Sequence, residues 1–519
     1  MQQTSPERGL AKFLTMITIV YKSKNYVIRK SYQELSDFFT SEGERVSKLK
    51  EFHHRATFPC TVEELYQYHS RPGALERLLP PWDGSRVIRK EGSIAPGGKV
   101  LMHLKQGPFT IPWEAHHIAE TPGVMFRDVQ HKGPFATFRH THRFSSTTNG
   151  SRLDDSITFA LPGQRFLPAM AERQVKTMLH RIFTYREHVL REDLKLHSKY
   201  SRTPLRILIS GASGVLGSAL VPLLTTGGHQ VWTLVRRKPS PGSHEIYWNP
   251  QNGELNPADI PEIDAVIHLA GEYIGVGRWG EEQRQRVVES RILGTELLAK
   301  TVAALPVPPK VFLSASAVGF YGNRHDTLID EREPAGDDFV SSVCEVWEKS
   351  TWPASNAGIR TVLMRFGVGL TPRGGALQRL LVSRAIGFIR YFGSGDQYVS
   401  WMSVDDMVAA MLHCLVTEEV AGPVNIAAPN PVTNRELMAG LAKVLNRPLL
   451  LPIPSKLLEI LHGQMAHEIV LSGCRASVKK LVDTGFEFRH PDLESAFTVL
   501  LGKSAGASRF INQPSGVEQ

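Results

Sequence analysis

The sequence predicts an α+β domain followed by an α/β domain with a Rossmann-like, doubly wound parallel sheet. Residues 49–195 consist mainly of short β-rich runs separated by Gly, Pro and polar turns, which is typical of an antiparallel sheet. From residue 204 onward, β-rich runs alternate with stretches of helical periodicity, which is typical of parallel βαβ units. The 519 residues are enough for two or three domains.

The composition is that of an ordinary soluble globular protein, with 42% hydrophobic and 21% charged residues. The net charge is +9, but the basic residues are dispersed and form no nucleic-acid-binding motif, so we expect no nucleic-acid partner. We find no apolar run long enough to cross a bilayer and no signal-peptide pattern, so we expect a cytoplasmic protein without a transmembrane segment. Four cysteines lie far apart without a CxxC pair, which fits a reducing compartment: Cys60, Cys344, Cys414 and Cys474.

Five strands and two helices are predicted in the first domain. The strands cover residues 99–104, 109–118, 124–131, 135–144 and 152–161. A short helix covers residues 61–69, because Thr61 and Glu64 form a capping-box pattern. A long amphipathic helix covers residues 166–194, with apolar residues at helical spacing: Leu167, Met170, Val175, Met178, Ile182, Tyr185 and Val189.

A curved sheet wrapped on one long helix leaves a cavity between the two. We therefore expect the first domain to enclose an apolar pocket for a small apolar ligand, with Met178 on the inward face of the helix. The alternative is a cavity filled by the domain's own aromatic side chains: Phe109, Trp113, Phe126 and Phe135.

Histidines cluster on the same strands: His103, His116, His117, His131, His140 and His142. His140 and His142 share one face of their strand, because strand side chains alternate. The cluster is either a metal site or a set of polar histidines on a half-wet sheet. We expect no metal site, because we find no Asp or Glu at a matching short spacing to complete a ligand set.

The segment from Arg206 to Gly217 indicates a dinucleotide site in the second domain. An apolar strand runs straight into a turn with three glycines, and a helical stretch at residues 218–224 follows. One glycine allows the tight turn, one lets the backbone approach a pyrophosphate, and one lets the helix pack on the strand. The helix N-terminus then offers N–H groups and a positive dipole end. The expected contacts are Gly211, Ser213, Gly214, Val215, Leu216 and Gly217.

The end of the next strand favours NADP over NAD. Residues 230–235 are apolar and β-rich, and Arg236, Arg237 and Lys238 follow them. An NAD site usually has an Asp or Glu near this strand end for the ribose 2′-hydroxyl, and no acid lies between Gln230 and Ser243. Guanidinium groups suit a 2′-phosphate, so we expect Arg236 and Arg237 to bind it.

The third and fourth strands of the domain end in small and hydroxyl residues. Leu269, Ala270 and Gly271 follow the third strand and would let the backbone lie against the adenine-side ribose and phosphates. Ligands of open α/β sheets bind beyond the carboxyl ends of the strands. Three hydroxyl residues therefore lie where a nicotinamide and a substrate would meet: Ser314, Ser316 and Tyr321.

Residues 204–501 resemble the extended short-chain dehydrogenase/reductase superfamily, the NAD-dependent epimerase/dehydratase group, and most closely the "epimerase family protein" subfamily with a small DUF1731-like C-terminal domain. The motifs that carry this resemblance are Gly211-Ala-Ser-Gly-Val-Leu-Gly217, Ile267-His-Leu-Ala-Gly-Glu272, Ser314-Ala-Ser-Ala-Val-Gly-Phe-Tyr-Gly322, Arg365-Phe-Gly-Val-Gly369 and Ser400-Trp-Met-Ser-Val-Asp-Asp406. The tail Gly485-Phe-Glu-Phe-Arg489 fits the C-terminal domain. The resemblance implies that Arg237, Leu269, Ala270 and Arg291 contact NADP.

The sequence departs from the superfamily at its catalytic pair. A Tyr with a Lys four residues later transfers the proton in these enzymes, and no such pair follows the fourth strand. The expected positions fall near Ser341 and Glu345. The nearest candidates are Ser316 and Tyr321, followed by Cys344 and Glu348. The resemblance implies an NADP-binding oxidoreductase or a nucleoside-sugar-epimerase-like enzyme, and the missing pair leaves an NADP-sensing or lipid-binding regulatory protein as the alternative.

The order of elements over residues 52–194 resembles the helix-grip fold of the START/SRPBCC superfamily, which implies an apolar ligand pocket. We therefore expect five segments: a tail at residues 1–46, a helix-grip domain at 47–196, a nucleotide-binding domain at 204–445, a DUF1731-like domain at 446–503 and a tail at 504–519. The polar residues 197–204 predict a linker.

Overall fold

The computed structural model describes residues 49–106, 109–162, 169–200, 203–275, 277–382 and 387–503. The two tails expected at residues 1–46 and 504–519 lie outside the described residues, as does the expected helix start at 166–168. The chain divides into two compact units. Unit 1 takes residues up to Tyr66 and Asp83–Glu187, and unit 2 takes Gln67–Trp82 and residues from His188 onward.

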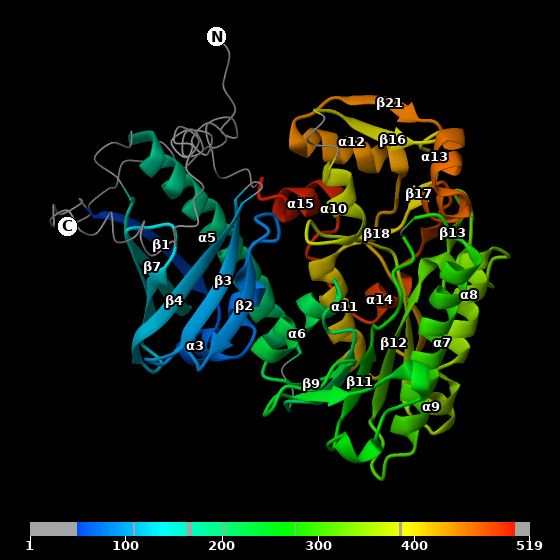
Figure 1. Cartoon of the computed structure of the whole chain (residues 1–519), viewed down its shortest axis with the longest axis horizontal. Coiled ribbons are helices and arrows are strands. Elements are labelled where there is room, and N and C mark those ends of the chain that lie inside the picture. Colours follow the sequence, from blue (N-terminus) through cyan, green and yellow to red (C-terminus); the bar gives the residue numbers. More distant parts are fainter. Residues whose placement is uncertain are drawn as a thin grey trace, which may run out of the picture. The chain divides into compact units, whose positions relative to one another are not determined.

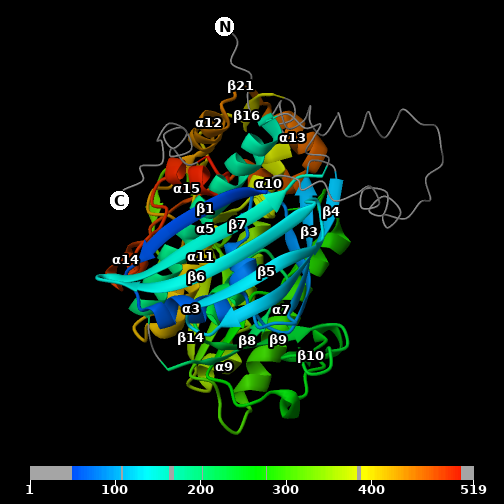
Figure 2. The ribbon, with the colours of Figure 1, turned by 90° about the vertical axis from the view of Figure 1, so that its left-hand side faces the viewer.

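Unit 1 is a seven-stranded antiparallel sheet in the order β1-β7-β6-β5-β4-β3-β2. Figure 2 shows the strands from β1 to β3 side by side. The first strand pairs with the last, which brings the two ends of the sheet's sequence together. The strands are β1 (Lys50–Phe58), β2 (Arg86–Glu91), β3 (Lys99–Gln106), β4 (Phe109–Thr121), β5 (Met125–Lys132), β6 (Thr137–Thr147) and β7 (Gly150–Ala160).

The core of unit 1 lies between this sheet and the helix α5 (Ala169–Lys199), whose residues up to Glu187 belong to the unit. Alternate strand residues face the helix, because side chains of a strand point to opposite faces in turn. This core contains Phe52, Phe138, Ile157, Phe159, Leu161, Ala171, Leu179 and Phe183. The predicted helix-grip arrangement, an antiparallel sheet with one long helix, is confirmed.

Helix α3 (Val62–Ser70) begins as the sequence predicts. The Thr61 hydroxyl accepts from the Glu64 N–H at 3.1 Å, and the Glu64 carboxylate accepts from the Thr61 N–H at 2.8 Å. The capping box thus satisfies two backbone N–H groups at the helix start.

The predicted inward face of α5 is wrong at its two methionines. Met170 and Met178 are 60% and 40% exposed, whereas Ala171, Leu179 and Phe183 are buried. The other described residues of the predicted face are buried or pack against a core: Val175, Ile182, Tyr185 and Val189. The helix also continues to Lys199, into the segment expected as a linker. Strands β1 and β2 were missed, because most of their side chains are polar or exposed.

Unit 2 contains the predicted doubly wound parallel sheet, with seven strands in the order β10-β9-β8-β11-β12-β14-β19. All neighbouring pairs are parallel. The strands are β8 (Arg206–Ser210), β9 (Gln230–Val235), β10 (Glu245–Tyr247), β11 (Ala265–His268), β12 (Val311–Ala317), β14 (Arg360–Phe366) and β19 (Gly422–Ile426). The strand order reverses direction beside β8, which is where such sheets bind dinucleotides.

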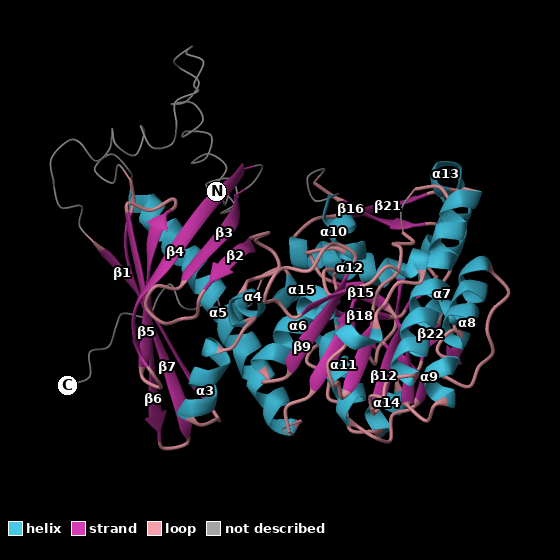
Figure 3. Ribbon diagram, turned by 60° about the horizontal axis from the view of Figure 1, so that its bottom comes forward, coloured by secondary structure: helices cyan, strands magenta, loops and turns pink. Residues whose placement is uncertain are grey.

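Helices cover both faces of the unit 2 sheet (Figure 3). Helices α6 (Gly217–Thr226) and α11 (Val404–Val416) pack on one face with Ile207, Ile267 and Leu313. Helix α7 (Glu281–Ala303) packs on the other face with Leu208, Val266 and Phe312. Burial on both faces explains why these strands read as continuous apolar runs.

Two helices follow one another after β12, namely α8 (Phe339–Lys349) and α9 (Trp352–Asn356). Pro353 lies in the first turn of α9, where a proline is tolerated, whereas it would break a continuous helix.

The remaining elements of unit 2 follow β14 or connect its strands. Four small two-stranded sheets pair β13 with β22, β15 with β18, β16 with β21, and β17 with β20. These elements are β13 (Leu328–Ile329), β15 (Val368–Leu370), α10 (Gly375–Val382), β16 (Ile389–Phe392), β17 (Tyr398–Val399), β18 (Trp401–Ser403), β20 (Val432–Thr433), α12 (Asn434–Leu445), β21 (Leu449–Ile453), α13 (Ser455–His462), β22 (Arg475–Ala476), α14 (Lys479–Asp483) and α15 (Leu493–Leu500) (Figure 1). Among the described helices, none combines the length and apolar character that a membrane span requires.

A buried ion network joins four distant segments of unit 2. Arg77 of the short helix α4 (Ala74–Leu78) donates from Nε to Asp193 at 2.7 Å and from Nη1 to Asp405 at 2.5 Å. Arg489 donates to Asp193 at 2.9 Å, and Tyr68 donates to the same carboxylate at 2.8 Å. Burial alone would raise the pKa of Asp193 and Asp405, but Arg77 and Arg489 outweigh it and lower both pKa values.

We predict that Arg77→Ala destabilises unit 2 by about 3–5 kcal/mol at neutral pH, because it removes the charge shared by two buried carboxylates. Urea unfolding followed by tryptophan fluorescence measures this, since every tryptophan except Trp113 belongs to unit 2. The matched control Lys195→Ala removes an exposed ion pair with Glu487 and should cost less than about 1 kcal/mol.

The pH dependence of this effect has a definite sign. The pKa values of Asp193 and Asp405 are lower in the folded chain, so their stabilisation is complete above the unfolded value of about 4 and is lost as the pH falls. The gap between wild type and Arg77→Ala should therefore narrow in acid. A gap that is constant from neutral to acid pH would contradict this account.

Candidate functional site

The turn between β8 and α6 has no room for side chains at two of its glycines. Gly211 has φ +72°, and a Cβ there would lie 2.7 Å from the carbonyl carbon of Leu269. A Cβ on Gly217 would lie 2.3 Å from the Gly211 carbonyl oxygen. The Gly214 N–H donates to the Gly211 carbonyl at 3.0 Å and closes the turn. These contacts assign the tight turn to Gly211 and the strand–helix packing to Gly217.

Helix α6 begins at Gly217, directly after this turn, with its first N–H groups at the carboxyl end of the sheet. Ser213, Gly214 and Val215 form the exposed part of the turn, with Val215 41% exposed, and Leu216 is half-buried. Unpaired N–H groups and the positive end of the helix dipole attract phosphate. The turn at residues 211–217, whose free space a side chain on its glycines would fill, therefore fits a dinucleotide pyrophosphate.

Ser210 and His268 hold the neighbouring strand end in place, and sequence reasoning missed both. The Ser210 hydroxyl lies 2.6 Å from His268 Nδ1 and accepts from the Leu269 and Ala270 N–H groups at 3.2 and 3.3 Å. Burial lowers the pKa of His268 to about 4, so its ring is neutral at pH 7. The hydroxyl thus fixes the 269–270 backbone beside Gly211. The signal in the sequence is a Ser and a His at the ends of adjacent parallel strands, which pair in register.

Arg237 has a partner that the sequence did not indicate. Its Nη1 donates to Glu245 Oε2 at 3.0 Å, and its Nη2 bonds the other carboxylate oxygen. This hydrogen bond, together with the Ser240 N–H, lowers the pKa of Glu245 to about 2. Glu245 is the first residue of β10, opposite Thr233 of β9, and Arg237 and Ser240 hydrogen-bond to it from the connection between the two strands. The Arg237 side chain is 60% exposed, whereas that of Glu245 is 18% exposed.

Arg291 and Ser314 lie deeper at the same edge of the sheet. The Arg291 guanidinium stacks over Trp347 with its carbon 4.8 Å from the ring centroid, and Nη1 donates to the Val287 carbonyl at 3.0 Å. A Cβ on Gly271 would lie 3.7 Å from this guanidinium, so Gly271 and Arg291 are neighbours. Ser314 is buried in the middle of β12 beside His268, its register partner, so the strand continues past the position that the sequence predicted as its end.

Ser316 and Tyr321 belong to one buried hydrogen-bond network. Ser316 donates to Glu348 at 2.6 Å, and Arg365 clamps the same carboxylate through Nε and Nη2 at 2.8 and 2.9 Å. Arg365 also donates to the Tyr321 hydroxyl at 3.0 Å, and that hydroxyl donates to Asn425 at 2.7 Å.

Burial governs the reactivity of this network. Tyr321 is fully buried, and desolvation raises its pKa to about 12 despite the nearby Arg365. Desolvation likewise raises the pKa of Cys344 to about 12, so this thiol stays protonated. Sequence reasoning missed Asn425 as a partner, because it arrives from β19, far along the chain.

The positions expected for the Tyr and Lys pair have other roles. The Ser341 N–H donates to the Asp338 carboxylate at the start of α8, and its hydroxyl donates to the Gly319 carbonyl at 3.0 Å. Glu345 accepts from Lys349 at 2.9 Å on the exposed side of the helix. Neither residue supplies the acidic hydroxyl that the superfamily's proton transfer uses.

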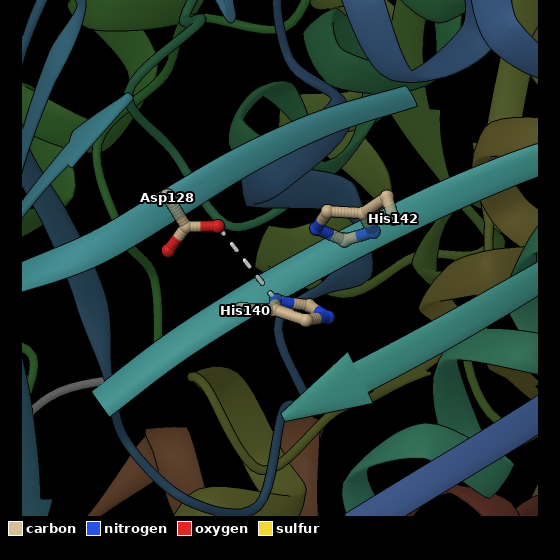
Figure 4. A group of neighbouring side chains, drawn as sticks. All are labelled: Asp128, His140 and His142. Atoms are coloured by element: carbon tan, nitrogen blue, oxygen red, sulfur yellow. Dashed lines mark ion pairs between the residues drawn. The ribbon is translucent and has the colours of Figure 1, made fainter. Parts of the chain in front are cut away.

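The histidines of unit 1 have acidic neighbours after all. Asp128 on β5 lies opposite His140 on β6, and Asp155 on β7 lies opposite His142. Sequence spacing did not indicate these carboxylates, because cross-strand register brings them to the histidines. Asp128, His140 and His142 form one group (Figure 4).

In unit 2 a glycine turn joins β8 to α6, and the strand order of the parallel sheet reverses beside β8. This combination defines a Rossmann-type dinucleotide-binding protein. Residues 207–427 match the NAD dependent epimerase/dehydratase family. An epimerase family protein of Mycobacterium tuberculosis is 40% identical over 290 residues, which cover 56% of this chain and 95% of that protein. The human epimerase family protein SDR39U1 is 34% identical over 295 residues, 56% of this chain and 98% of that protein. The chain belongs to this epimerase family.

Solved structures agree with this assignment and extend it to the flanking segments. The nucleoside-diphosphate sugar epimerase from Corynebacterium glutamicum is 32% identical, with a TM-score of 0.73 over 87% of this chain and 90% of that chain. Human SDR39U1 (isoform 2), solved with NADPH, is 31% identical with a TM-score of 0.53 over 57% and 99%. Residues 453–500 match the domain of unknown function DUF1731, and residues 58–183 match the polyketide cyclase / dehydrase and lipid transport family.

Proposed function

We propose that unit 2 binds NADP(H) at the carboxyl edge of its parallel sheet. The proposal rests mainly on the turn at Gly211 and Gly217. A side chain at either glycine would collide with backbone atoms, and without one a pyrophosphate can approach the backbone of the turn. The relative solved with NADPH supports it. The residues that would hold the cofactor are Gly211, Ser213, Gly214, Val215, Leu216, Gly217, Arg236, Arg237, Leu269, Ala270, Gly271, Arg291 and Ser314.

Arg236 and Arg237 would bind the 2′-phosphate and make NADP preferred over NAD. A guanidinium forms forked, charge-assisted hydrogen bonds to phosphate, which carries more charge than the Glu245 carboxylate that Arg237 holds. In this proposal Glu245 keeps Arg237 extended at the strand end until the phosphate displaces it. NAD lacks the 2′-phosphate, so it offers Arg237 no anion in place of the Glu245 carboxylate.

We predict that the wild-type chain binds NADP more tightly than NAD, and that Arg237→Ala loses about 1.5–3 kcal/mol of NADP affinity with little change for NAD. Isothermal calorimetry with both cofactors measures this. The matched control is Arg332→Ala, an exposed arginine that is also paired with a carboxylate. Equal affinities of the wild type for both cofactors would refute the assignment of the 2′-phosphate site.

We propose further that unit 2 is an NADP-dependent oxidoreductase or nucleoside-sugar-epimerase-like enzyme acting on a small molecule. A bound nicotinamide would supply hydride transfer. Ser316 and Tyr321 would serve the reaction through the Glu348–Arg365 network, which fixes the hydroxyl of each. The resemblance to a nucleoside-diphosphate sugar epimerase supports this class.

One observation favours a second candidate, an NADP-sensing or lipid-binding regulatory protein. Tyr321 is fully buried and hydrogen-bonded, Ser316 is 3% exposed, and Ser341 and Glu345 stand where the proton-transfer pair is expected. A cofactor cradle combined with an altered proton-transfer site would bind the nucleotide without turning it over.

A turnover assay separates the two candidates. We predict that the purified full-length chain oxidises NADPH or reduces NADP when supplied with a metabolite extract, and that Ser316→Ala lowers kcat at least about tenfold while the NADP Kd stays constant. Ser342→Ala, an exposed serine of α8, is the control. Tight NADP binding without turnover in any extract fraction would favour the regulatory protein.

We propose that unit 1 binds a small apolar ligand between its sheet and α5. The matched family, which includes lipid transport proteins, supports this, as does the half-buried Val175 on the sheet-facing side of the helix. Aromatic rings occupy part of this space: Trp113 and Phe138 lie edge to face with centroids 4.8 Å apart. Phe109, by contrast, is 50% exposed.

We predict that a fluorescent fatty-acid or quinone analogue binds the full-length chain with micromolar affinity, and that Val175→Trp weakens this binding at least about tenfold by filling the space. Met178→Trp is the matched control, because Met178 is on the exposed side of the same helix and its replacement should leave binding unchanged. If no apolar probe binds saturably, unit 1 is not a carrier of apolar ligands.

A further inference from the structure

A row of polar side chains crosses the inner face of the unit 1 sheet. His117, Asp128 and His140 are register partners on β4, β5 and β6. The ring of His140 meets Phe183 of α5 edge to face, with centroids 5.5 Å apart, so this row lies between sheet and helix. Carboxylates in such a place need compensation by hydrogen bonds, by an opposite charge or by a metal ion.

Asp155 fixes the proton of one imidazole in this row and lies close to a second. Its Oδ1 lies 3.0 Å from His140 Nε2 in a hydrogen bond, and 2.7 Å from His142 Nδ1 without hydrogen-bond geometry. A carboxylate oxygen only accepts, so His140 Nε2 carries a proton. In the neutral imidazole of His140, Nδ1 then presents its lone pair.

These two imidazoles converge with Asp128. One nitrogen of each ring and one Asp128 oxygen lie within 4.8 Å of one another, and Figure 4 shows Asp128 facing His140 across the strands. His140 Nδ1 lies 3.8 Å from Asp128 Oδ2, which is too far for a hydrogen bond. Ligand atoms of a tetrahedral zinc site are about 3.3 Å apart. The distance between the two most widely separated ligand atoms, at most 4.8 Å here, would therefore have to shorten by up to about 1.5 Å for the group to surround an ion.

We propose that Asp128, His140 and His142 bind a divalent first-row transition-metal ion, with Asp155 as the carboxylate that orients His140 and lies beside His142. Two imidazoles and one carboxylate are a donor set suited to Zn²⁺ and its neighbours in the first row. A ligating histidine normally donates its other N–H to a carboxylate, which is the arrangement that Asp155 provides for His140. Three protein ligands leave a position for water or for an oxygen atom of a ligand bound beneath α5.

Arg186 of α5 offers the competing solution. Its guanidinium is buried and is near enough to Asp128 and Asp155 for each charge to act on the other. In that case Arg186 balances the carboxylates, and the row is a polar network that binds no ion. The two accounts differ in one measurable property, the affinity for a transition metal.

The test is a titration of the chelator-treated, tag-free full-length chain with Co²⁺, followed by visible absorption, and with Zn²⁺, followed by calorimetry. We expect one equivalent of each ion and a Co²⁺ absorption of tetrahedral type. Asp128→Asn and His142→Gln should each weaken binding at least about 100-fold, and Asp155→Asn by about 10–100-fold. The control His53→Gln, on β1 with its side chain 65% exposed, should bind like the wild type.

Two variants guard against misfolding, which circular dichroism detects: if Asp128→Asn does not fold, His142→Gln decides. Equal affinity in the folded Asp128→Asn or His142→Gln variant and in His53→Gln would show that surface histidines take the metal, and would overturn the proposal. Failure of the wild type to bind one equivalent would overturn it as well, and would leave Arg186 as the group that balances the carboxylates.

Discussion

Unit 2 depends on the burial of one carboxylate. Asp193 has no exposed surface, and it accepts from Tyr68 and Arg77, which share the segment Gln67–Trp82, and from Arg489, far along the chain. A buried charge is tolerated only with partners in good geometry, so these segments must be in place together. Arg77 extends the requirement to Asp405 at the start of α11, the helix that packs on the parallel sheet. The sheet edge that carries the site is thereby fixed to segments far from it.

At that edge of the sheet, backbone atoms occupy the space that side chains would otherwise fill. Gly211 and Gly217 leave no space for a Cβ, and Ser210 holds the 269–270 backbone against the same turn. Polar groups nearby are engaged with one another: Arg237 with Glu245, Arg365 with Glu348, Ser316 with the same carboxylate. Such pairs keep the site ordered before any ligand arrives, and a ligand must compete with them for each donor.

Much of the parallel sheet was predictable, because its strands are apolar on both faces and its glycine spacing is specific. The strands at residues 206–210 and 230–235 have the predicted bounds. The glycine contacts follow from the same pattern. What the sequence could not supply were partners set by the fold: Asp128 and Asp155 reach the histidines through strand register, whereas a connecting loop brings Arg237 to Glu245 and a turn brings Tyr321 to Asn425. Met170 and Met178 of α5 were also misplaced, because exposed methionines look apolar in a one-dimensional pattern.

The assignment of residues 67–82 to unit 2 bears on how the chain is made. The ribosome releases this segment before most of unit 1, yet its Arg77 pairs with Asp193 and Asp405, which emerge more than a hundred residues later. Domains generally fold as units in order of synthesis. In this chain Arg77 cannot form its two ion pairs until Asp193 and Asp405 have been synthesised, so unit 2 cannot be completed in the order of the sequence.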